Sequence, residues 1–393
     1  MSGSTVRFAP WPSYSAEEIE AVRQVLETGK VNYWTGTEGR EFEREFASHV
    51  GTRHSVAVAN GTVALELALA VFDIGPGDEV ITTPRTFIAS ASCAVMRGAM
   101  PIFADVDRDS QNITASTIEK VITERTRAVI PVHLAGWPCE MDEIMDLARQ
   151  HDLVVIEDCA QANGATYRGR PVGGIGDAGA FSFCQDKIIT TGGEGGMLTT
   201  SDEARWSRAW SYKDHGRSYD AVYKRVHPPG YRWLHDTFGT NWRLTEMQSA
   251  IGRIQLRSLS RSVQQRNANA ALLLEGMSRI SGLRAPAPPA HVRHAYYKFY
   301  AFVEPSALRS GWSRDRIMAE IAATGVPCFS GSCPEVYLEK AFDGSRSRPA
   351  ERLPVARELG ETSLMFLVHP TLGPEQMRRT LDATASVMQQ AVR

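Results

Sequence analysis

The chain contains no long uninterrupted apolar run. Glu66 and Asp73 break its most hydrophobic window, so we expect no membrane-spanning helix. The first ten residues, MSGSTVRFAP, lack the apolar core of a secretory signal peptide. These absences predict a cytoplasmic protein that does not use a membrane as a partner.

Cysteine and excess charge are scarce as well. The six cysteines form no CxxC pair and no Cys/His cluster in the sequence, which predicts reduced thiols and no zinc site. The formal net charge of −2 lacks the strong basic excess typical of nucleic-acid-binding proteins. With 393 residues, of which 43% are hydrophobic, the chain can bury a large core, and two domains are expected.

From about residue 54, short strand-like runs alternate with helical stretches. The strand-like runs are residues 55–59, 80–83, 101–106, 128–133, 153–158 and 178–183, with helical patterns at 62–72 and 141–151 between them. Because these runs are apolar throughout, they predict a mostly parallel sheet covered by helices on both faces. The expected fold class is a doubly wound α/β domain, in which ligands bind beyond the carboxyl ends of the strands.

Two domains are predicted, residues 1–255 and residues 256–393. The first begins with a helix marked by a capping box at Ser15 and Glu18. Residues 205–240 interrupt its alternating pattern and are too long for a plain connector, although their aromatic residues favour an ordered structure.

The second predicted domain is a smaller α+β unit that follows a proline-rich stretch. Its expected elements are a strand at 296–303 and helices at 314–324 and 374–387.

Lys187 and Asp158 are the residues that suggest a chemistry. Lys187 lies between a strand-like run and a turn rich in glycine, where a ligand can approach the backbone closely. Asp158 ends the strand-like run 153–158. Pyridoxal phosphate requires a lysine that forms a Schiff base and a carboxylate that holds its pyridinium nitrogen. Alone, either residue is more often a surface lysine or a strand-end aspartate.

Further residues near the same sheet edge suit a phosphate and an aromatic ring. Gly61 and Thr62 open a helix directly after a strand, where free N–H groups attract an anion. Phe87 can stack on a flat ring, Ser182 can donate to a phosphate and Gln161 can reach a ring oxygen. Each also has an ordinary alternative: a helix cap, a core phenylalanine, a buried serine or an exposed amide.

The order and spacing of these motifs resemble the DegT/StrS family of sugar aminotransferases. The resemblance runs from about residue 10 to 375 and rests on Asn60-Gly-Thr62, Pro84-Arg-Thr-Phe87, Glu157-Asp-Cys-Ala-Gln161, Phe181-Ser-Phe with Lys187, Gly193-Glu-Gly-Gly196 and Gly239-Thr-Asn-Trp-Arg243. It implies the type I aminotransferase fold, a homodimer and pyridoxal 5'-phosphate as cofactor. It also implies glutamate as amino donor and a nucleotide-linked keto deoxysugar as acceptor, in amino sugar synthesis for a surface polysaccharide such as lipopolysaccharide O-antigen or for a natural product.

The resemblance also implies roles around the cofactor ring. Lys187 forms the Schiff base and moves a proton, and Asp158 pairs with the pyridine nitrogen. Phe87 stacks on the ring, and Gln161 lies near the ring hydroxyl.

At the phosphate, the resemblance implies contacts from Gly61, Thr62 and Ser182. Asn241 resembles the position whose side chain reaches the phosphate of the neighbouring subunit. The expected homodimer therefore has shared active sites.

Four places depart from the family pattern, and they leave the substrate open. Asn163 stands where the family often has histidine, residues 184–186 and 328–335 differ from the common motifs, and the segment 205–240 is longer than usual. These regions are expected to shape the substrate pocket. Basic residues of the 205–240 segment can hold a nucleotide diphosphate or be solvated surface charges; they include Lys213, Arg217, Lys224 and Arg225.

Other functions remain open at this point. A relative of the same family can be a cyclitol aminotransferase, a sugar dehydratase or an amino-aromatic synthase, although Lys187 argues against dehydratases that carry histidine there. A regulatory protein that binds pyridoxal phosphate without turnover is the alternative of another class. The absence of a DNA-binding module and the near-neutral charge count against it. A purely structural protein on this fold is the last alternative.

Overall fold

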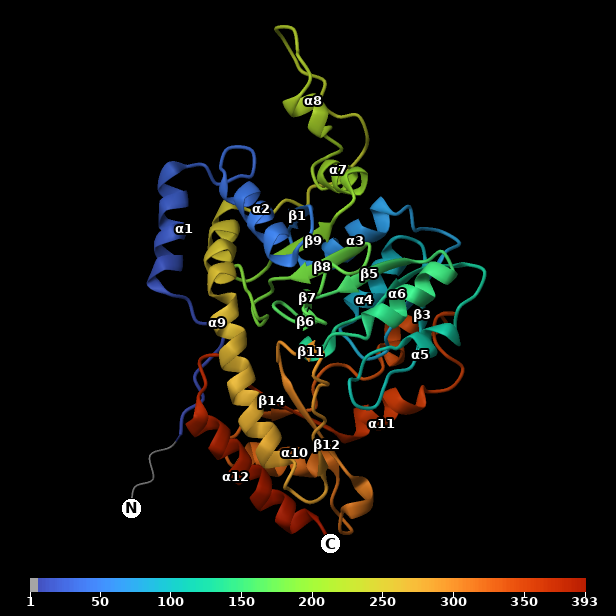
Figure 1. The fold of residues 1–393 in the computed structure, drawn as a ribbon, viewed down its shortest axis with the longest axis vertical. Coiled ribbons are helices and arrows are strands. Elements are labelled where there is room, and N and C mark those ends of the chain that lie inside the picture. Colours follow the sequence, from blue (N-terminus) through green and yellow to red (C-terminus); the bar gives the residue numbers. More distant parts are fainter. Residues whose placement is uncertain (1–5) are drawn as a thin grey trace.

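The computed structural model of the protein describes residues 6–393, and two sheets organise it (Figure 1). The larger sheet has seven strands in the order β1-β9-β8-β5-β4-β2-β3. Its strands are β1 (His54–Val58), β2 (Glu79–Thr82), β3 (Met100–Phe103), β4 (Thr126–Ile130), β5 (Val154–Asp158), β8 (Ala178–Ser182) and β9 (Gly196–Thr200). Only β9 runs against its two neighbours, so the predicted mostly parallel sheet is confirmed.

Helices cover both faces of this sheet, as the runs that are apolar throughout predicted. On β1, Val56 and Val58 pack into a core with α3 (Gly61–Val71), α4 (Ala89–Met96) and α7 (Glu203–Tyr212). Ala57 points to the opposite face, where α2 (Glu38–Val50) and α9 (Glu246–Met277) pack. Along β5, Val155 contributes to a further core beneath α5 (Ala115–Glu119) and α6 (Met141–Gln150).

Helix α9 links the two sheets in one continuous element. Its 32 residues run beside the larger sheet and continue to the smaller one (Figure 1). The predicted domain boundary at residue 255 falls inside this helix, so no interruption of the chain marks it. The division into residues 1–255 and 256–393 stays a prediction.

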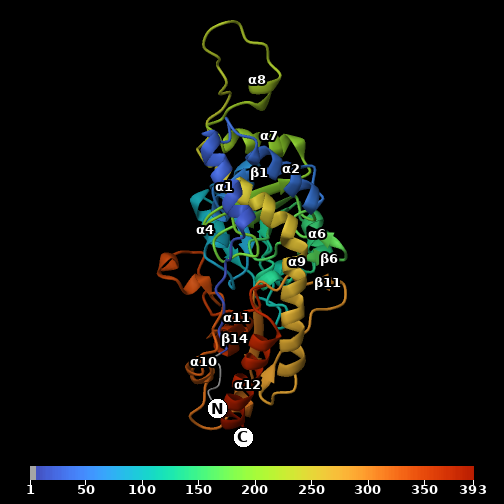
Figure 2. The ribbon, with the colours of Figure 1, turned by 90° about the vertical axis from the view of Figure 1, so that its left-hand side faces the viewer.

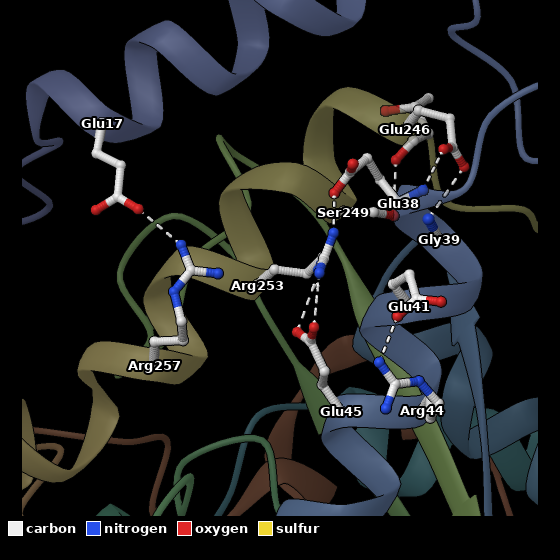
Figure 3. A network of polar contacts seen from close by, with 11 residues as sticks. Glu17, Glu38, Gly39, Glu41, Arg44, Glu45, Glu246, Ser249, Arg253 and Arg257 are labelled. Carbon is white, nitrogen blue, oxygen red and sulfur yellow. Dashed lines mark hydrogen bonds and ion pairs between the residues drawn. The ribbon is translucent and has the colours of Figure 1, made fainter.

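The first half of α9 is held to α2 and α1 (Ala16–Thr28) by charged side chains (Figure 3). Arg253 pairs with Glu38 and with Glu45, each at 2.7 Å. Glu246 accepts the backbone N–H groups of Glu38 at 2.6 Å and Gly39 at 3.1 Å. The start of α2 is therefore capped by a side chain from a distant helix. The predicted capping box at the start of α1 is confirmed.

The smaller sheet has four antiparallel strands in the order β10-β12-β14-β13. They are β10 (Leu283–Arg284), β12 (Phe299–Val303), β13 (Cys328–Phe329) and β14 (Ser363–Phe366). The end of α9 packs here with α10 (Arg314–Ala323) and α12 (Pro374–Ala391), near α11 (Pro354–Thr362). Phe8, in the N-terminal arm that precedes α1 (residues 6–15), packs against this core. A small third sheet combines β6 (Thr166–Tyr167), β7 (Arg170–Pro171) and β11 (Val292–Arg293).

Residues 218–240 project from the end of the molecule that lies farthest from the smaller sheet (Figures 1 and 2). This projecting arm contains α8 (Tyr219–Tyr223) and a loop, and α7 precedes it in the chain. The segment that interrupted the predicted pattern is thus partly helical. Within residues 6–393, no helix combines the length and the apolar character that crossing a membrane requires.

Candidate active site

A cavity of about 780 Å³ lies where the carboxyl ends of β5 and β8 meet the smaller sheet. The predicted cofactor residues that line it are Gly61, Thr62, Phe87, Asp158, Gln161, Ser182 and Lys187. They come from strand ends, a helix start and connecting loops, which the doubly wound sheet brings to one edge. Asn241 does not line this cavity.

Asp158 supplies a buried carboxylate at the floor of the cavity. Its side chain is 4% exposed and accepts hydrogen bonds from the Ser90 hydroxyl at 2.7 Å and the Ala160 N–H at 3.1 Å. Burial raises the pKa of Asp158, while these hydrogen bonds and Lys187 act in the opposite direction. Within residues 6–393 it forms no ion pair. The protonated nitrogen of a bound pyridine ring would supply the missing cation.

Gly61 and Thr62 form a cradle that suits an anion at the start of α3. Asn60 caps the helix by accepting the Val63 N–H at 3.0 Å, so the N–H groups of the first two residues remain for a ligand. A Cβ atom at position 61 would lie 2.7 Å from the Cβ of Ser182. Only glycine allows α3 and β8 to approach this closely, which places the Ser182 hydroxyl beside the helix start.

Lys187 lies in the connection from β8 to β9. Its Nζ is 3.9 Å from the carboxylate of Asp186 and 4.8 Å from the centre of the Tyr297 ring. Its backbone carbonyl accepts a hydrogen bond from the Trp11 indole at 2.9 Å. The N-terminal arm and the smaller sheet therefore both help to position the segment that carries the lysine.

Phe87 and Gln161 both line the cavity, the first as an exposed residue and the second as a buried one. Phe87 is 67% exposed and lines the cavity, so its ring is free to contact a ligand. Gln161 is buried, and its Oε1 accepts the Ala135 N–H at 2.8 Å. This hydrogen bond leaves the amide nitrogen of Gln161 as the end available to the cavity.

Glu157 holds the segment behind Asp158, and the sequence did not indicate this role. Its carboxylate accepts the N–H groups of Gly173, Ile175 and Gly176 at 2.7–2.8 Å. Burial alone would raise the pKa of Glu157, but the His133 ring and these backbone groups lower it. His133 donates to Glu157 at 3.0 Å and accepts the Cys139 N–H at 3.0 Å.

The ligand atoms of His133, Glu157 and Cys159 lie within 4.8 Å of one another, a spacing that a metal ion could use. The hydrogen bonds just described already occupy the carboxylate oxygens and both ring nitrogens. Burial also raises the pKa of the Cys159 thiol, which disfavours the thiolate that binds metals. This group is therefore better described as a structural network than as a metal site.

The structure corrects one expectation for the basic residues of the 205–240 segment. Lys213 is fully buried and pairs with Glu43 at 2.6 Å, so it cannot bind a nucleotide diphosphate. Burial inside a folded core, rather than charge, decides its role. Lys224 and Arg225 lie on the projecting arm, where they pair with Asp220 at 2.9 Å and Asp236 at 3.3 Å.

The departures from the family pattern fall in different places. Cys184 lines the cavity, as do Gly331, Ser332 and Cys333 of the 328–335 stretch. Asn163 is buried outside the cavity lining, and within residues 6–393 its amide atoms have no hydrogen-bond partner.

Several cavity residues gave no signal in the sequence. Ser90 contacts Asp158 from α4, Tyr300 approaches from β12, and Tyr297 and Lys298 approach from the residues just before β12. Their contribution depends on contacts between elements that are far apart in the chain.

The fold and the functional groups around the cavity define a class of protein. A lysine at the strand edge, a buried carboxylate without a cation and an anion cradle are the groups that pyridoxal phosphate requires. A family model, described as the DegT/DnrJ/EryC1/StrS aminotransferase family, matches residues 12–384. The chain belongs to this family, and it is a pyridoxal phosphate-dependent aminotransferase with the type I fold.

Individual relatives support the same assignment. The X-ray structure of an aminotransferase from Psychrobacter cryohalolentis superposes with a TM-score of 0.96 at 56% identity, covering 98% of this chain and 99% of that one. The GDP-perosamine synthase of Caulobacter vibrioides is 37% identical over 96% of this chain and 97% of its own. A putative L-glutamine:3-amino-2,3-dideoxy-scyllo-inosose aminotransferase of Streptoalloteichus tenebrarius is 37% identical over 98% and 96%.

Proposed function

We propose that this aminotransferase moves an amino group from glutamate to a keto group of a nucleotide-linked deoxysugar. The similarity to GDP-perosamine synthase supports an acceptor of this class. The observation that carries the proposal is the joint position of Lys187 and Asp158 in one cavity of about 780 Å³. Pockets of about 300–1,000 Å³ hold ligands of drug size. All six cysteines are free thiols, which supports the proposal that the enzyme is cytoplasmic.

Within this proposal each cavity residue has a defined task. Lys187 Nζ would hold the cofactor covalently and, once the donor amine has displaced it, would move a proton from the donor carbon to C4′ of the cofactor. Asp158 holds the proton on the pyridine nitrogen. When bound, the cofactor supplies a ring that withdraws electrons from the reacting carbon.

The remaining residues of the site bind and orient the cofactor. The N–H groups of Gly61 and Thr62 and the hydroxyl of Ser182 bind the phosphate. Phe87 stacks on the ring, and the amide of Gln161 contacts the ring hydroxyl. Asn241 is proposed to reach the phosphate bound by a second subunit of a homodimer.

A cyclitol ketone is the second candidate acceptor. The relative from Streptoalloteichus tenebrarius, which is named for an inosose, is as similar to this chain as the perosamine synthase. Its name also specifies glutamine as donor, so both amino acids belong in any test.

The proposed reaction is tested by combining each of two amino donors with each of several keto acceptors. Purified protein loaded with pyridoxal phosphate is incubated with glutamate or glutamine and with keto sugars linked to GDP, dTDP or UDP, or with scyllo-inosose. We expect an aminated nucleotide sugar by mass spectrometry, and none with Lys187→Ala. Amination of scyllo-inosose alone would transfer the assignment to the cyclitol class.

Borohydride reduction provides an independent test of the lysine. Reduction of the loaded wild-type protein, followed by peptide mapping, is expected to place the pyridoxyl group on Lys187. A label on another lysine would overturn the proposed site.

A further inference from the structure

Lys298 is a cation beside the reacting lysine, and within residues 6–393 no carboxylate contacts its ammonium group directly. Nζ of Lys187 and Nζ of Lys298 lie 4.8 Å and 4.7 Å from the centre of the same Tyr297 ring. The nearby carboxylate of Asp186 instead accepts the Tyr297 hydroxyl and lies 3.9 Å from Lys187. In the part of the chain that the structure describes, Lys298 Nζ makes no hydrogen bond and no ion pair.

A second cation with unused donors lies in an adjoining cavity of about 230 Å³. Lys298 lines both this cavity and the larger one, and Arg266 of α9 lines the smaller. Arg266 is 1% exposed, and its Nη1 donates to the carbonyl oxygens of Tyr296 and Tyr297 at 3.3 Å. Its Nε and Nη2 are buried without a partner among residues 6–393.

Both cations are held at a cost. Burial lowers the pKa of Lys298 to about 8 and that of Arg266 to about 9, so each lacks part of its hydration. A cation that has lost part of its hydration and contacts no anion is stabilised by a ligand of opposite charge. Asp186, which lines both cavities, acts to raise the pKa of Lys298 and of Arg266, but its carboxylate already accepts the Tyr297 hydroxyl. His369, which lines the same small cavity, adds no charge; burial lowers its pKa to about 3, so its ring is neutral.

The cofactor phosphate does not account for this pair of cations. Its proposed cradle consists of Gly61, Thr62 and Ser182, which line the larger cavity but not the smaller one. The unused donors of Lys298 and Arg266 belong instead to the side formed by α9, the N-terminal arm and the smaller sheet. These donors are therefore available to a separate anionic group.

We propose that Lys298, together with Arg266 in the adjoining cavity, forms a binding site for a carboxylate of the amino-acid donor. The inference rests on the proposed function, because it assumes that the donor is an amino acid. The donor amine must reach the position of Lys187 Nζ, so a donor with both an amine and a carboxylate spans the two lysines beside Tyr297. Charge-assisted hydrogen bonds to a carboxylate are among the strongest that proteins make.

The first experiment measures carboxylate binding without chemistry. Glutarate carries two carboxylates but no amine, and its affinity for the loaded protein is measured by calorimetry. Lys298→Met is expected to weaken glutarate binding by about 10- to 100-fold, as the loss of a charged hydrogen bond predicts. Lys298→Arg keeps the cation and should stay within about threefold of wild type, and Lys340→Met, on the exposed surface, is the matched control.

The second experiment separates donor from acceptor and identifies the carboxylate. The cofactor absorbance change is followed with glutamate, glutamine (without the γ-carboxylate) and the α-amide of glutamate. Lys298→Met should raise the half-saturating concentration of donors that keep the bound carboxylate, and leave unaffected the donor that lacks it. The half-reaction with the keto acceptor should change by less than about threefold.

Two results would overturn the carboxylate site. One is glutarate binding by Lys298→Met at wild-type affinity; the other is an equal loss in the donor and acceptor half-reactions. Failure of the proposed function looks different: no keto sugar is aminated, while glutarate binding still depends on Lys298. The cofactor absorbance of each variant verifies that the protein is folded and loaded.

Discussion

At the residue scale, Asp158 is a buried carboxylate whose charge calls for a cationic ligand. Asp158→Asn keeps the size of the side chain, and its amide can still bond to Ser90 and to the Ala160 N–H. An amide cannot hold the proton on a pyridine nitrogen, so we expect turnover to fall about 10²- to 10³-fold. Steady-state rates check this, with Asp382→Asn on the exposed face of α12 as control. A rate near that of wild type would remove Asp158 from its role.

Gly61 gives a purely steric prediction. In Gly61→Ala the new Cβ would lie 2.7 Å from the Cβ of Ser182, so α3 or β8 must shift where the phosphate is expected to bind. We expect the affinity for pyridoxal phosphate to fall about tenfold or more, because cradle geometry is lost. Titration of the apoprotein, followed by absorbance, measures this.

The matched control for Gly61→Ala is Gly75→Ala. A Cβ there meets only the Arg97 carbonyl at 3.5 Å, an ordinary contact outside the cavity. Equal cofactor affinity in Gly61→Ala and wild type would show that the helix start does not bind the phosphate.

The site residues that the sequence revealed lie in recognisable local patterns, whereas those that it did not reveal depend on contacts across the fold. Lys187, Asp158 and Gly61 stand next to strand or helix ends, so local patterns reveal them. Ser90 and Lys298 gave no such signal, because their importance comes from contacts across the fold. Lys213 was misjudged for the same reason: the sequence shows its charge but not its burial against Glu43.

At the element scale, the start of α2 depends on α9. Thr37 makes no capping hydrogen bond with its side chain, whereas Glu246 accepts the N–H groups of Glu38 and Gly39 (Figure 3). Glu246→Gln replaces one acceptor oxygen by an N–H donor, which should cost about 1–2 kcal/mol of stability. Thermal unfolding should show a Tm lower by a few degrees.

The control for this cap is Glu275→Gln, near the other end of α9. Glu275 is exposed, and among residues 6–393 its carboxylate pairs only with Arg279, at 2.7 Å, so the Tm of Glu275→Gln should match that of wild type. If both variants unfold at the wild-type Tm, the long-range cap does not stabilise α2.

Element types were predictable where the apolar pattern was strong. The strand-like run 153–158 corresponds to β5 (Val154–Asp158), and the helical pattern 141–151 to α6 (Met141–Gln150). The antiparallel β9 was not predicted, because pairing direction depends on the path between strands. The 32-residue length of α9 was also missed, since its polar central part faces different neighbours along its course.

At the scale of the whole molecule, the projecting arm presents large apolar side chains to solvent. Val226 is 93% exposed, Tyr231 76%, Trp233 80% and Phe238 100%. Exposed apolar groups gathered on one segment mark a surface for association. Asn241 lies at the base of this arm, exposed and outside the cavity of its own chain. These features support a homodimer in which Asn241 serves the neighbouring site.

Subunit mixing tests that arrangement. Lys187→Ala and Asn241→Ala are each expected to be nearly inactive as homodimers. A mixed dimer pairs an intact Lys187 with the partner's intact Asn241 in one of its two sites, because a two-fold interface exchanges the same surfaces. Random exchange should therefore restore roughly a quarter of the wild-type activity. The control mixes Lys187→Ala with Asp158→Asn; both changes affect residues of the same cavity, so no mixed dimer gains an intact site. Native mass spectrometry verifies the exchange, and mixed dimers without recovered activity would show that each subunit completes its own site.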